Sequence, residues 1–544
     1  MRRIIAAVLL TIASFPFLAS AQETQHTPKL VVNIVVSQMR YDYLKRFGHN
    51  FAERGIRLMM NEGVNCTNAR YDYMGNNTAA GLTTILSGAS PAAHGIVSDR
   101  WLDYTTNEPV YVISDKNYFG LGCMEILGQF APTQLTASTI GDELKRHNPM
   151  AQVISIALEP VSGVIGGGRM ADAAYWFDPF RGNWCTSTYY TDRLPNWVDN
   201  FNQQKMVDSY NQREWSLFHL PSKYVYTERS EITADADRRS VTFSLNRLFK
   251  RKENEGYYRM QITPMGVDMM MEFVKQTIVY EGLGKDNQPD LLTITIDPFR
   301  FISETYGTES METEDALYRL DANIASLIEF TDTQLGKNNT LFILTADHGS
   351  SDTYRPEESR HPGGLFNVMQ FKVLINGFLN TQYGVENWVV DYANSSLYLN
   401  HRAVFEKGLN LDEMQSKVAA FALQFRGVAQ AITGAAMQNN HYAGGALQKI
   451  QNGYYPKHSG DIVINLMPGW IEEEENKVSL TGSIYEYDTH VPLMFYGAGI
   501  RRETIHTPVC ITNVAPTLAR ILGVSRPDAS TGVEIIPITQ RFTK

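Results

Sequence analysis

The sequence predicts an α/β fold: a doubly wound, mostly parallel sheet with inserted cap elements. Apolar and β-branched runs without polar alternation are typical of strands buried on both faces. Such runs occupy residues 30–36, 153–158, 291–296, 340–345 and 491–496. Helical stretches lie between them, most clearly at 137–146 and 311–335. Strands alternating with helices favour a parallel sheet, whose functional residues gather at the carboxyl ends of the strands.

Two stretches break this alternation. Residues from about 170 to 265 are rich in Tyr, Trp, Asn and Asp, and residues from about 355 to 460 mix short strands with Gly and Asn turns. We interpret both as insertions or cap elements over the sheet. Because the chain has no internal repeat and no Pro/Ser-rich linker, residues 22–544 are expected to form one main domain with these insertions.

The N-terminus has the pattern of an export signal. Arg2 and Arg3 precede an apolar stretch, and Ala19-Ser20-Ala21 is a small-x-small cleavage site. This predicts a cleaved signal peptide at residues 1–21 and a periplasmic or secreted protein. The alternative is an N-terminal membrane anchor, but the apolar run is shorter than the ~20 residues that a span needs. No later segment is apolar enough to predict a transmembrane span.

Composition excludes some partners and leaves the cysteines open. The formal net charge is −10, which argues against nucleic acid as a main partner. An exported protein can form disulfides, and the cysteine spacings fit no zinc-finger pattern. One or two disulfides and four buried thiols both remain open for Cys66, Cys123, Cys185 and Cys510.

Thr78 begins a segment of small residues that is expected to open a helix. A hydroxyl at a helix N-terminus lies near free backbone N–H groups, which suits a nucleophile that acts on an anionic group. The alternative is that Thr78 is only an N-cap residue.

Two further motifs contain residue types that can bind a metal and lie next to predicted strands. Asp347 and His348 come directly after the run at 340–345, and His490 precedes the last one. Carboxylate and imidazole side chains at strand ends suit a zinc site. Asp347 could instead cap a turn, and His490 could be a half-buried histidine with its own hydrogen-bond partner.

Together these segments resemble the alkaline phosphatase superfamily, in particular the periplasmic zinc alkaline phosphatases of Bacteroidetes-type bacteria, which are related to nucleotide pyrophosphatase/phosphodiesterases. The resemblance covers nearly the whole chain after residue 21. The matching segments are 38–43, 88–101, 139–145, 174–178, 186–190, 194–198, 345–349 and 487–492.

The resemblance implies a threonine nucleophile and two zinc ions that activate the attacking and leaving oxygens. Thr78 corresponds to the nucleophile, while Asp347, His348 and His490 correspond to retained zinc ligands. Other family positions differ: an Asp is replaced by serine, an Asp-x-x-x-His pair by Arg and Glu, a Lys-x-Arg pair by Glu and Val, and an Asn by Asp. The replaced positions are Ser37, Arg300, Glu304, Glu159, Val161 and Asp99.

These replacements remove metal ligands and reverse the charge that would face a phosphate. A guanidinium cannot bind a metal, so two zinc ions are not expected, and the cofactor prediction is none or one weakly bound zinc. We expect Arg300 to take over the positive charge of zinc by pairing with Asp347, Glu304 or Glu159.

The sequence therefore predicts an alkaline phosphatase-like hydrolase fold that is catalytically impaired or inactive, a pseudophosphatase with a binding or assembly role. The expected partner is a periplasmic or cell-surface protein or a small anionic ligand. The alternatives are a threonine-nucleophile hydrolase of phosphoric or sulfuric esters with at most one metal, and a working phosphomonoesterase.

Overall fold

The computed structural model describes residues 27–211, 213–226, 242–244, 256–354, 363–475 and 477–542, so the predicted signal peptide at residues 1–21 lies outside the described residues. The main body is built on one ten-stranded sheet. In spatial order its strands are β21 (Glu503–Ile505), β2 (Val64–Cys66), β20 (Leu493–Gly497), β13 (Thr340–Thr345), β1 (Leu30–Val36), β12 (Asp290–Ile296), β7 (Val153–Ala157), β8 (Ala173–Asp178), β9 (Asn183–Ser187) and β6 (Gly120–Leu121).

The centre of this sheet is parallel, as the sequence predicts. Strands β13, β1, β12, β7 and β8 pair in parallel, and each neighbour is reached through a crossover. The edges are mixed, because β20 pairs antiparallel with β13, and β9 pairs antiparallel with β8. The predicted run at 491–496 is thus a strand, but it runs opposite to the central strands. The α/β fold class is confirmed.

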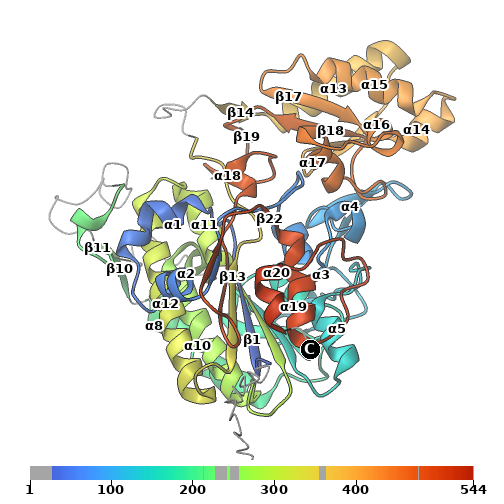
Figure 1. The fold of residues 1–544 in the computed structure, drawn as a ribbon. Coiled ribbons are helices and arrows are strands. Elements are labelled where there is room, and N and C mark those ends of the chain that lie inside the picture. Colours follow the sequence, from blue (N-terminus) through green and yellow to red (C-terminus); the bar gives the residue numbers. More distant parts are fainter. Residues whose placement is uncertain are drawn as a thin grey trace, which may run out of the picture.

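Helices cover both faces of the sheet (Figure 1). One layer contains α2 (Ile56–Glu62), α10 (Pro264–Tyr280), α11 (Asp297–Tyr306) and α12 (Met311–Leu335). The other contains α3 (Thr78–Ser87), α5 (Ile140–His147), α6 (Pro160–Gly167) and α19 (Val514–Leu522). Helix α12 has the bounds that its apolar spacing predicts, and α5 begins after a capping box made by Thr139 and Asp142.

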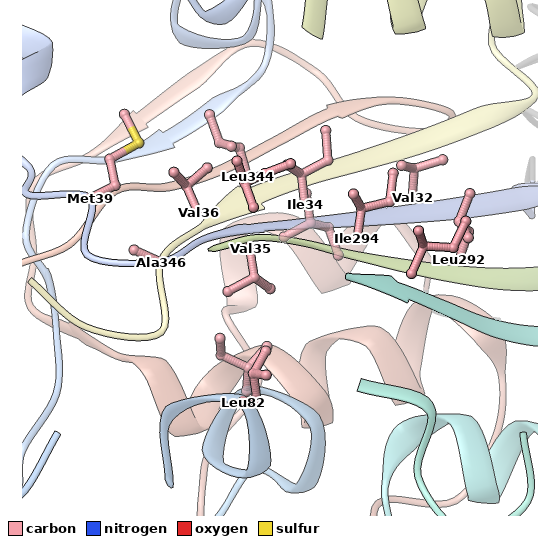
Figure 2. Close-up of a cluster of buried hydrophobic side chains, with 14 of the residues drawn as sticks. Val32, Ile34, Val35, Val36, Met39, Leu82, Leu292, Ile294, Leu344 and Ala346 are labelled. Carbon is pink, nitrogen blue, oxygen red and sulfur yellow. The ribbon is translucent and has the colours of Figure 1, made fainter. Parts of the chain in front are cut away.

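The core lies between these layers, and β1 runs through its centre. All seven residues of β1 are buried. Figure 2 shows Leu82 of α3 facing Val35 of β1, with Ile34, Ile294 and Leu344 among the residues around the neighbouring strands. Burial of each such side chain contributes about 1.5–3 kcal/mol, so this packing holds the strand ends in register.

A second, antiparallel sheet has its own hydrophobic core, formed by residues from Phe366 to Leu466. It lies above the end of the main sheet where β1 leads into α1 (Figure 1). Its strands, in spatial order, are β15 (Val389–Ala393), β16 (Ser396–Leu399), β18 (Ile462–Leu466) and β17 (Val428–Thr433). Its helices are α13 (Val368–Tyr383), α14 (His401–Glu406), α15 (Leu411–Ala422), α16 (Gly434–Asn439) and α17 (Gly445–Gly453).

Short elements complete the described chain. Three strand pairs lie outside the two sheets: β4 (Arg100–Asp103) with β5 (Glu108–Tyr111), β14 (Gly364–Phe366) with β19 (Trp470–Glu472), and β22 (Val509–Cys510) with β3 (Ala69–Arg70). A fourth joins β10 (Glu214–Ser216) to β11 (Thr242–Ser244). The remaining α-helices are α1 (Asp42–Phe47), α4 (Pro91–His94), α7 (Asn196–Gln203), α8 (Met206–Asn211), α18 (Glu486–Thr489) and α20 (Ile536–Thr539).

The first predicted insertion starts too early at about 170. Strands β8 and β9, within 173–187, extend the main sheet, and β8 is buried along its whole length. Its Tyr, Trp and Phe residues suit a strand that packs under helices, which explains why aromatic richness was misleading here. All four cysteines are free thiols, and the Cys123 thiol lies within hydrogen-bond reach of the Cys185 thiol. None of the described helices is long and apolar enough to cross a bilayer.

Candidate active site

Three neighbouring strands end together beneath the second sheet. The parallel register pairs Val36 of β1 with Ile296 of β12, and the Ser37 backbone N–H donates to the Ile296 carbonyl at 3.3 Å. Ser37 and Asp297 each follow one of these strands directly, and Asp347 lies two residues after the end of β13. The parallel sheet therefore gathers side chains that lie far apart in the sequence at one edge.

Asp347 is completely buried, and groups next to β1 engage its carboxylate. The Ser37 hydroxyl donates to Oδ2 at 2.5 Å, and the Gln38 backbone N–H donates to Oδ1 at 3.2 Å. Gln38 has φ 69°, a left-handed conformation that costs a non-glycine residue about 1–2 kcal/mol. The Ser303 hydroxyl donates to the Gln38 side-chain oxygen and helps to hold this conformation.

Thr78 is the first residue of α3, and Asn77 is its N-cap. The Asn77 side-chain oxygen accepts from the Ala80 N–H at 3.1 Å, so the alternative in which Thr78 serves as the cap is wrong. The Thr78 hydroxyl is buried without a hydrogen-bond partner among the described residues. A Cβ on Gly81 would lie 2.1 Å from the Asp347 carbonyl oxygen, so only glycine allows this turn to pack against Asp347.

His348 presents a second polar atom without a partner. Its Nδ1 lies 2.8 Å from the Gly349 carbonyl, which favours a proton on Nδ1 and a lone pair on Nε2. Nε2 is buried with no hydrogen-bond partner among the described residues and lies 3.5 Å from Asp347 Oδ2. The structure thus brings Asp347 and His348 together, beside the turn of α3 that Thr78 begins.

Arg300 lies on α11 in a network of ion pairs. One of its Nη atoms pairs with Glu159, 141 residues away, and the other lies 3.7 Å from Glu304, one turn along the helix. Lys477 extends the network, with its Nζ 3.5 Å from Glu304 and 2.8 Å from Glu474. Two of the three expected partners of Arg300 therefore pair with it, while Asp347 bonds to Ser37 instead.

Asp297 lies near this network, and its carboxylate binds the segment at the start of α6. Its Oδ2 accepts from the backbone N–H groups of Leu158 and Glu159 at 3.0 Å, and its Oδ1 accepts from the Ser162 hydroxyl at 2.5 Å. Burial raises the pKa of Asp297 to about 6, opposed by the Ser162 hydrogen bond. Burial likewise raises the pKa of Glu159 to about 7, opposed by the Arg300 charge.

Asp99 places a carboxylate at the start of α3. The backbone N–H of Ala79, next to Thr78, lies close enough to this carboxyl to lower its pKa. The Asp99 side chain is accessible to solvent, yet the surrounding protein raises its pKa by desolvation, opposed chiefly by the Arg300 charge. Val161 of α6 packs against the main core and supplies no cation. A helix N-terminus that suits an anion thus already holds one from the chain itself.

His490 does not join the site, which corrects the prediction that groups it with Asp347 and His348. Its Nε2 lies 3.1 Å from the Thr67 carbonyl, and its ring stacks on Tyr41 with 4.3 Å between centroids. The alternative, a half-buried histidine with its own partner, describes it correctly. The turn after α18 directs this side chain away from the strand ends.

A polar pocket of about 250 Å³ lies between the strand ends and the second sheet. Thr78, Asp347 and His348 do not line it, whereas the replaced residues Asp99, Arg300 and Glu304 do. Its other lining residues include Asn76, Asn77, Ser98, Asn394, Ser395, Asn465, Trp470, Glu472, Glu474, Lys477, Thr481, Ser483, Tyr487 and Asp488. Most of this second group escaped the sequence analysis, because no motif marks these residues and they converge only in the folded chain.

The side chains at the strand ends do not fit a two-zinc centre. No group of three or more His, Cys, Asp or Glu residues in the described part of the chain is placed to hold a metal ion. Ser37 already bonds one Asp347 oxygen, and the Arg300 guanidinium pairs with Glu159 and Glu304. A zinc ion beside this guanidinium would meet like-charge repulsion in a desolvated site.

Known proteins resemble this chain along most of its length. The family described as type I phosphodiesterase / nucleotide pyrophosphatase matches residues 31–490. A protein of Myroides odoratus named calcium-transporting ATPase is 32% identical, covering 96% of each chain. The alkaline phosphatase PafA of Elizabethkingia meningoseptica is 30% identical, again covering 96% of each chain. A crystal structure of wild-type PafA matches with a TM-score of 0.87 and 28% identity, covering 94% of this chain and 99% of that one.

Proposed function

This chain belongs to the type I phosphodiesterase / nucleotide pyrophosphatase family, and we propose that it is an exported alkaline phosphatase-like protein that has lost two-zinc phosphatase chemistry and serves a binding role. One observation carries the proposal: Arg300 pairs with Glu159 and Glu304 at the strand ends. The Arg300 guanidinium, which is always positively charged, thus lies among carboxylates. It neutralises negative charge that a metal ion would otherwise neutralise.

The ion pairs of Arg300 avoid the free-energy cost of unpaired buried charges. Arg300 and Glu304 are largely buried, with side chains 15% and 7% exposed. A buried charge without a partner typically costs 3–5 kcal/mol, so loss of metal ligands alone would leave the fold strained. The Arg300 pairs relieve that strain, which supports a site rebuilt to fold without zinc.

The nucleophile equivalent is also poorly placed for turnover. The Thr78 hydroxyl is buried, has no base within hydrogen-bond reach among the described residues, and does not line the pocket. Asp99 lines the pocket and would face a substrate phosphate with negative charge. Positioning and electrostatic stabilisation of the transferring group are the main sources of phosphoryl-transfer catalysis, and neither is provided here.

The export signature at residues 1–21 supports a periplasmic or secreted location for this binding role. A cell-surface or periplasmic protein is the partner class that this location suggests. The second sheet, with its own core, supplies a surface additional to the strand-end site.

Metal analysis combined with turnover tests the proposal. The purified chain should contain fewer than two zinc ions, and hydrolysis of p-nitrophenyl phosphate should be equal in the wild type and in Thr78→Ala. Two zinc ions per chain, or turnover that Thr78→Ala abolishes, would contradict it. The variant is a suitable control because the Thr78 hydroxyl makes no hydrogen bond in the described chain, so its removal should not disturb folding.

A second candidate is a hydrolase with one metal, and a separate observation favours it. His348 Nε2 and the Thr78 hydroxyl are both buried without hydrogen-bond partners in the described chain, beside the Asp347 carboxylate. These three groups would hold the metal, which would supply Lewis-acid activation of the hydroxyl. One zinc per chain together with Thr78-dependent hydrolysis of a phosphate or sulfate ester would establish this alternative.

A further inference from the structure

The pocket above the strand ends contains hydrogen-bond acceptors that lack donors. Asn76, Asn465 and Asp488 line it, and each is no more than 2% exposed. In each, the Oδ1 atom has no hydrogen-bond partner among the described residues. The Asn76 amide donates to the carbonyls of Tyr73 and Ser483, which fixes the orientation of its oxygen. A buried acceptor left unpaired costs about 1–3 kcal/mol, so these oxygens suit a ligand that donates hydrogen bonds.

The pocket also carries excess negative charge. Its wall contains five carboxylates and two cationic side chains, a formal excess of three negative charges when all are ionised: Asp99, Glu304, Glu472, Glu474 and Asp488 against Arg300 and Lys477. Both cations are already engaged by carboxylates of the wall. Neither is therefore free to bind a phosphate ester.

Three of these carboxylates, Asp99, Glu472 and Asp488, have no cation at hydrogen-bond distance in the described chain. Glu472 accepts from the hydroxyls of Tyr392 and Ser395, at 2.8 and 3.0 Å, and Asp488 accepts from the Ser483 backbone N–H at 2.8 Å. Desolvation raises the pKa of all three carboxyls. A bound cation would compensate this desolvation in the way that a partner charge does.

We propose that this pocket binds a small organic ammonium ion, an amine, in place of a phosphate ester. This inference rests on the proposed function, because a working two-zinc site would give the pocket the opposite charge preference. The N–H groups of an amine would satisfy the orphaned oxygens, and Tyr487 adds an aromatic side chain to the pocket wall. The described residues contain no group placed to hold a metal ion, which favours an organic cation over a divalent one.

Calorimetry on the full chain with three matched probes tests this proposal. 1,4-Diaminobutane should bind, while the neutral 1,4-butanediol and inorganic phosphate should bind at least about tenfold more weakly, equivalent to about 1.4 kcal/mol. Asp99→Asn removes one wall charge at a solvent-accessible side chain and should weaken diamine binding by a similar factor. Glu329→Gln, at an exposed residue of α12 that does not line the pocket, should leave binding unchanged.

Each outcome decides the matter. Equal binding of the diamine and the diol, or equal loss in Asp99→Asn and Glu329→Gln, would overturn the requirement for charge and with it the proposal. Phosphate binding without diamine binding would overturn it as well. Failure of the diamine to bind a zinc-free, inactive chain sinks this inference alone. Two zinc ions with Thr78-dependent turnover would instead overturn the proposed function.

Discussion

The two sides of the strand-end site differ in how their polar groups are engaged. On one side, Thr78 and His348 each have a buried polar atom without a hydrogen-bond partner in the described chain, and neither residue is held by a cation. On the other, Arg300 pairs with Glu159 and Glu304, although its own Nε atom is also buried without a partner in the described chain. The difference between the two sides therefore lies in the compensation of charge by ion pairs.

The ion pairs on the Arg300 side have an energetic consequence. Random loss of metal ligands leaves buried charges unpaired, which is strongly destabilising. Here the three charged residues that pair come from two segments, because Glu159 is the N-cap residue of α6 while Arg300 and Glu304 lie on α11.

The largest expected effect comes from breaking the paired side. Arg300→Met should lower the free energy of unfolding by about 3–5 kcal/mol, because it leaves Glu159 without a cation and Glu304 with Lys477 alone. Urea denaturation measures this loss. Arg402→Met is the matched control, since its pair with Glu406 is exposed to solvent and should contribute little to stability. Equal losses in the two variants would show that the Arg300 network is not structural.

A smaller loss of unfolding free energy is expected at Ser37, directly after β1. Ser37→Ala removes the 2.5 Å hydrogen bond to Asp347, and hydrogen bonds to charged groups contribute about 1.5–3 kcal/mol. Denaturant unfolding should show a loss in that range. Ser416→Ala, which removes an exposed hydroxyl bonded to the Asp412 carbonyl, should cost less. A neutral Ser37→Ala would mean that Asp347 is held by other groups.

The pH dependence of stability probes Glu159 directly. Its pKa is raised from the ordinary 4.5 to about 7, so between these values the folded chain binds more protons than the unfolded chain. Stability should therefore fall as pH rises from 5.5 to 7.5, with Glu159 contributing on the order of 1–2 kcal/mol. Glu159→Gln should flatten this dependence, while Asp290 and Asp321, whose pKa values are also raised to about 6 and which do not contact Glu159, act equally in both proteins. An unchanged slope would show that Glu159 stays ionised throughout.

The smallest effect is expected at Thr78. Thr78→Val keeps the shape of the side chain and removes a hydroxyl that has no hydrogen-bond partner in the described chain, so the free energy of unfolding should change by less than about 0.5 kcal/mol or rise. Thermal denaturation without added metal measures it. A loss above 1 kcal/mol would reveal a partner for this hydroxyl and remove the contrast between the two sides.

Local pattern was enough for much of the fold. The buried runs at 30–36 and 340–345 are strands with those bounds, and the apolar spacing of 311–335 gives one helix. The spacing of apolar residues predicts which helices and strands form, because it reflects whether one face or both faces of an element are buried. They do not state direction or neighbours, so the antiparallel course of β20 and the place of β8 and β9 in the main sheet were missed.

The site shows the same division. The sequence by itself determined which residue types stand at each position, including an arginine and two glutamates close to the strand ends. Only the tertiary structure decided that Arg300 pairs with Glu159 rather than Asp347, and that His490 turns toward Thr67. The physical reason is that a side chain's partner depends on which distant segments pack beside it and on the direction that its backbone imposes, and neither is encoded in local spacing.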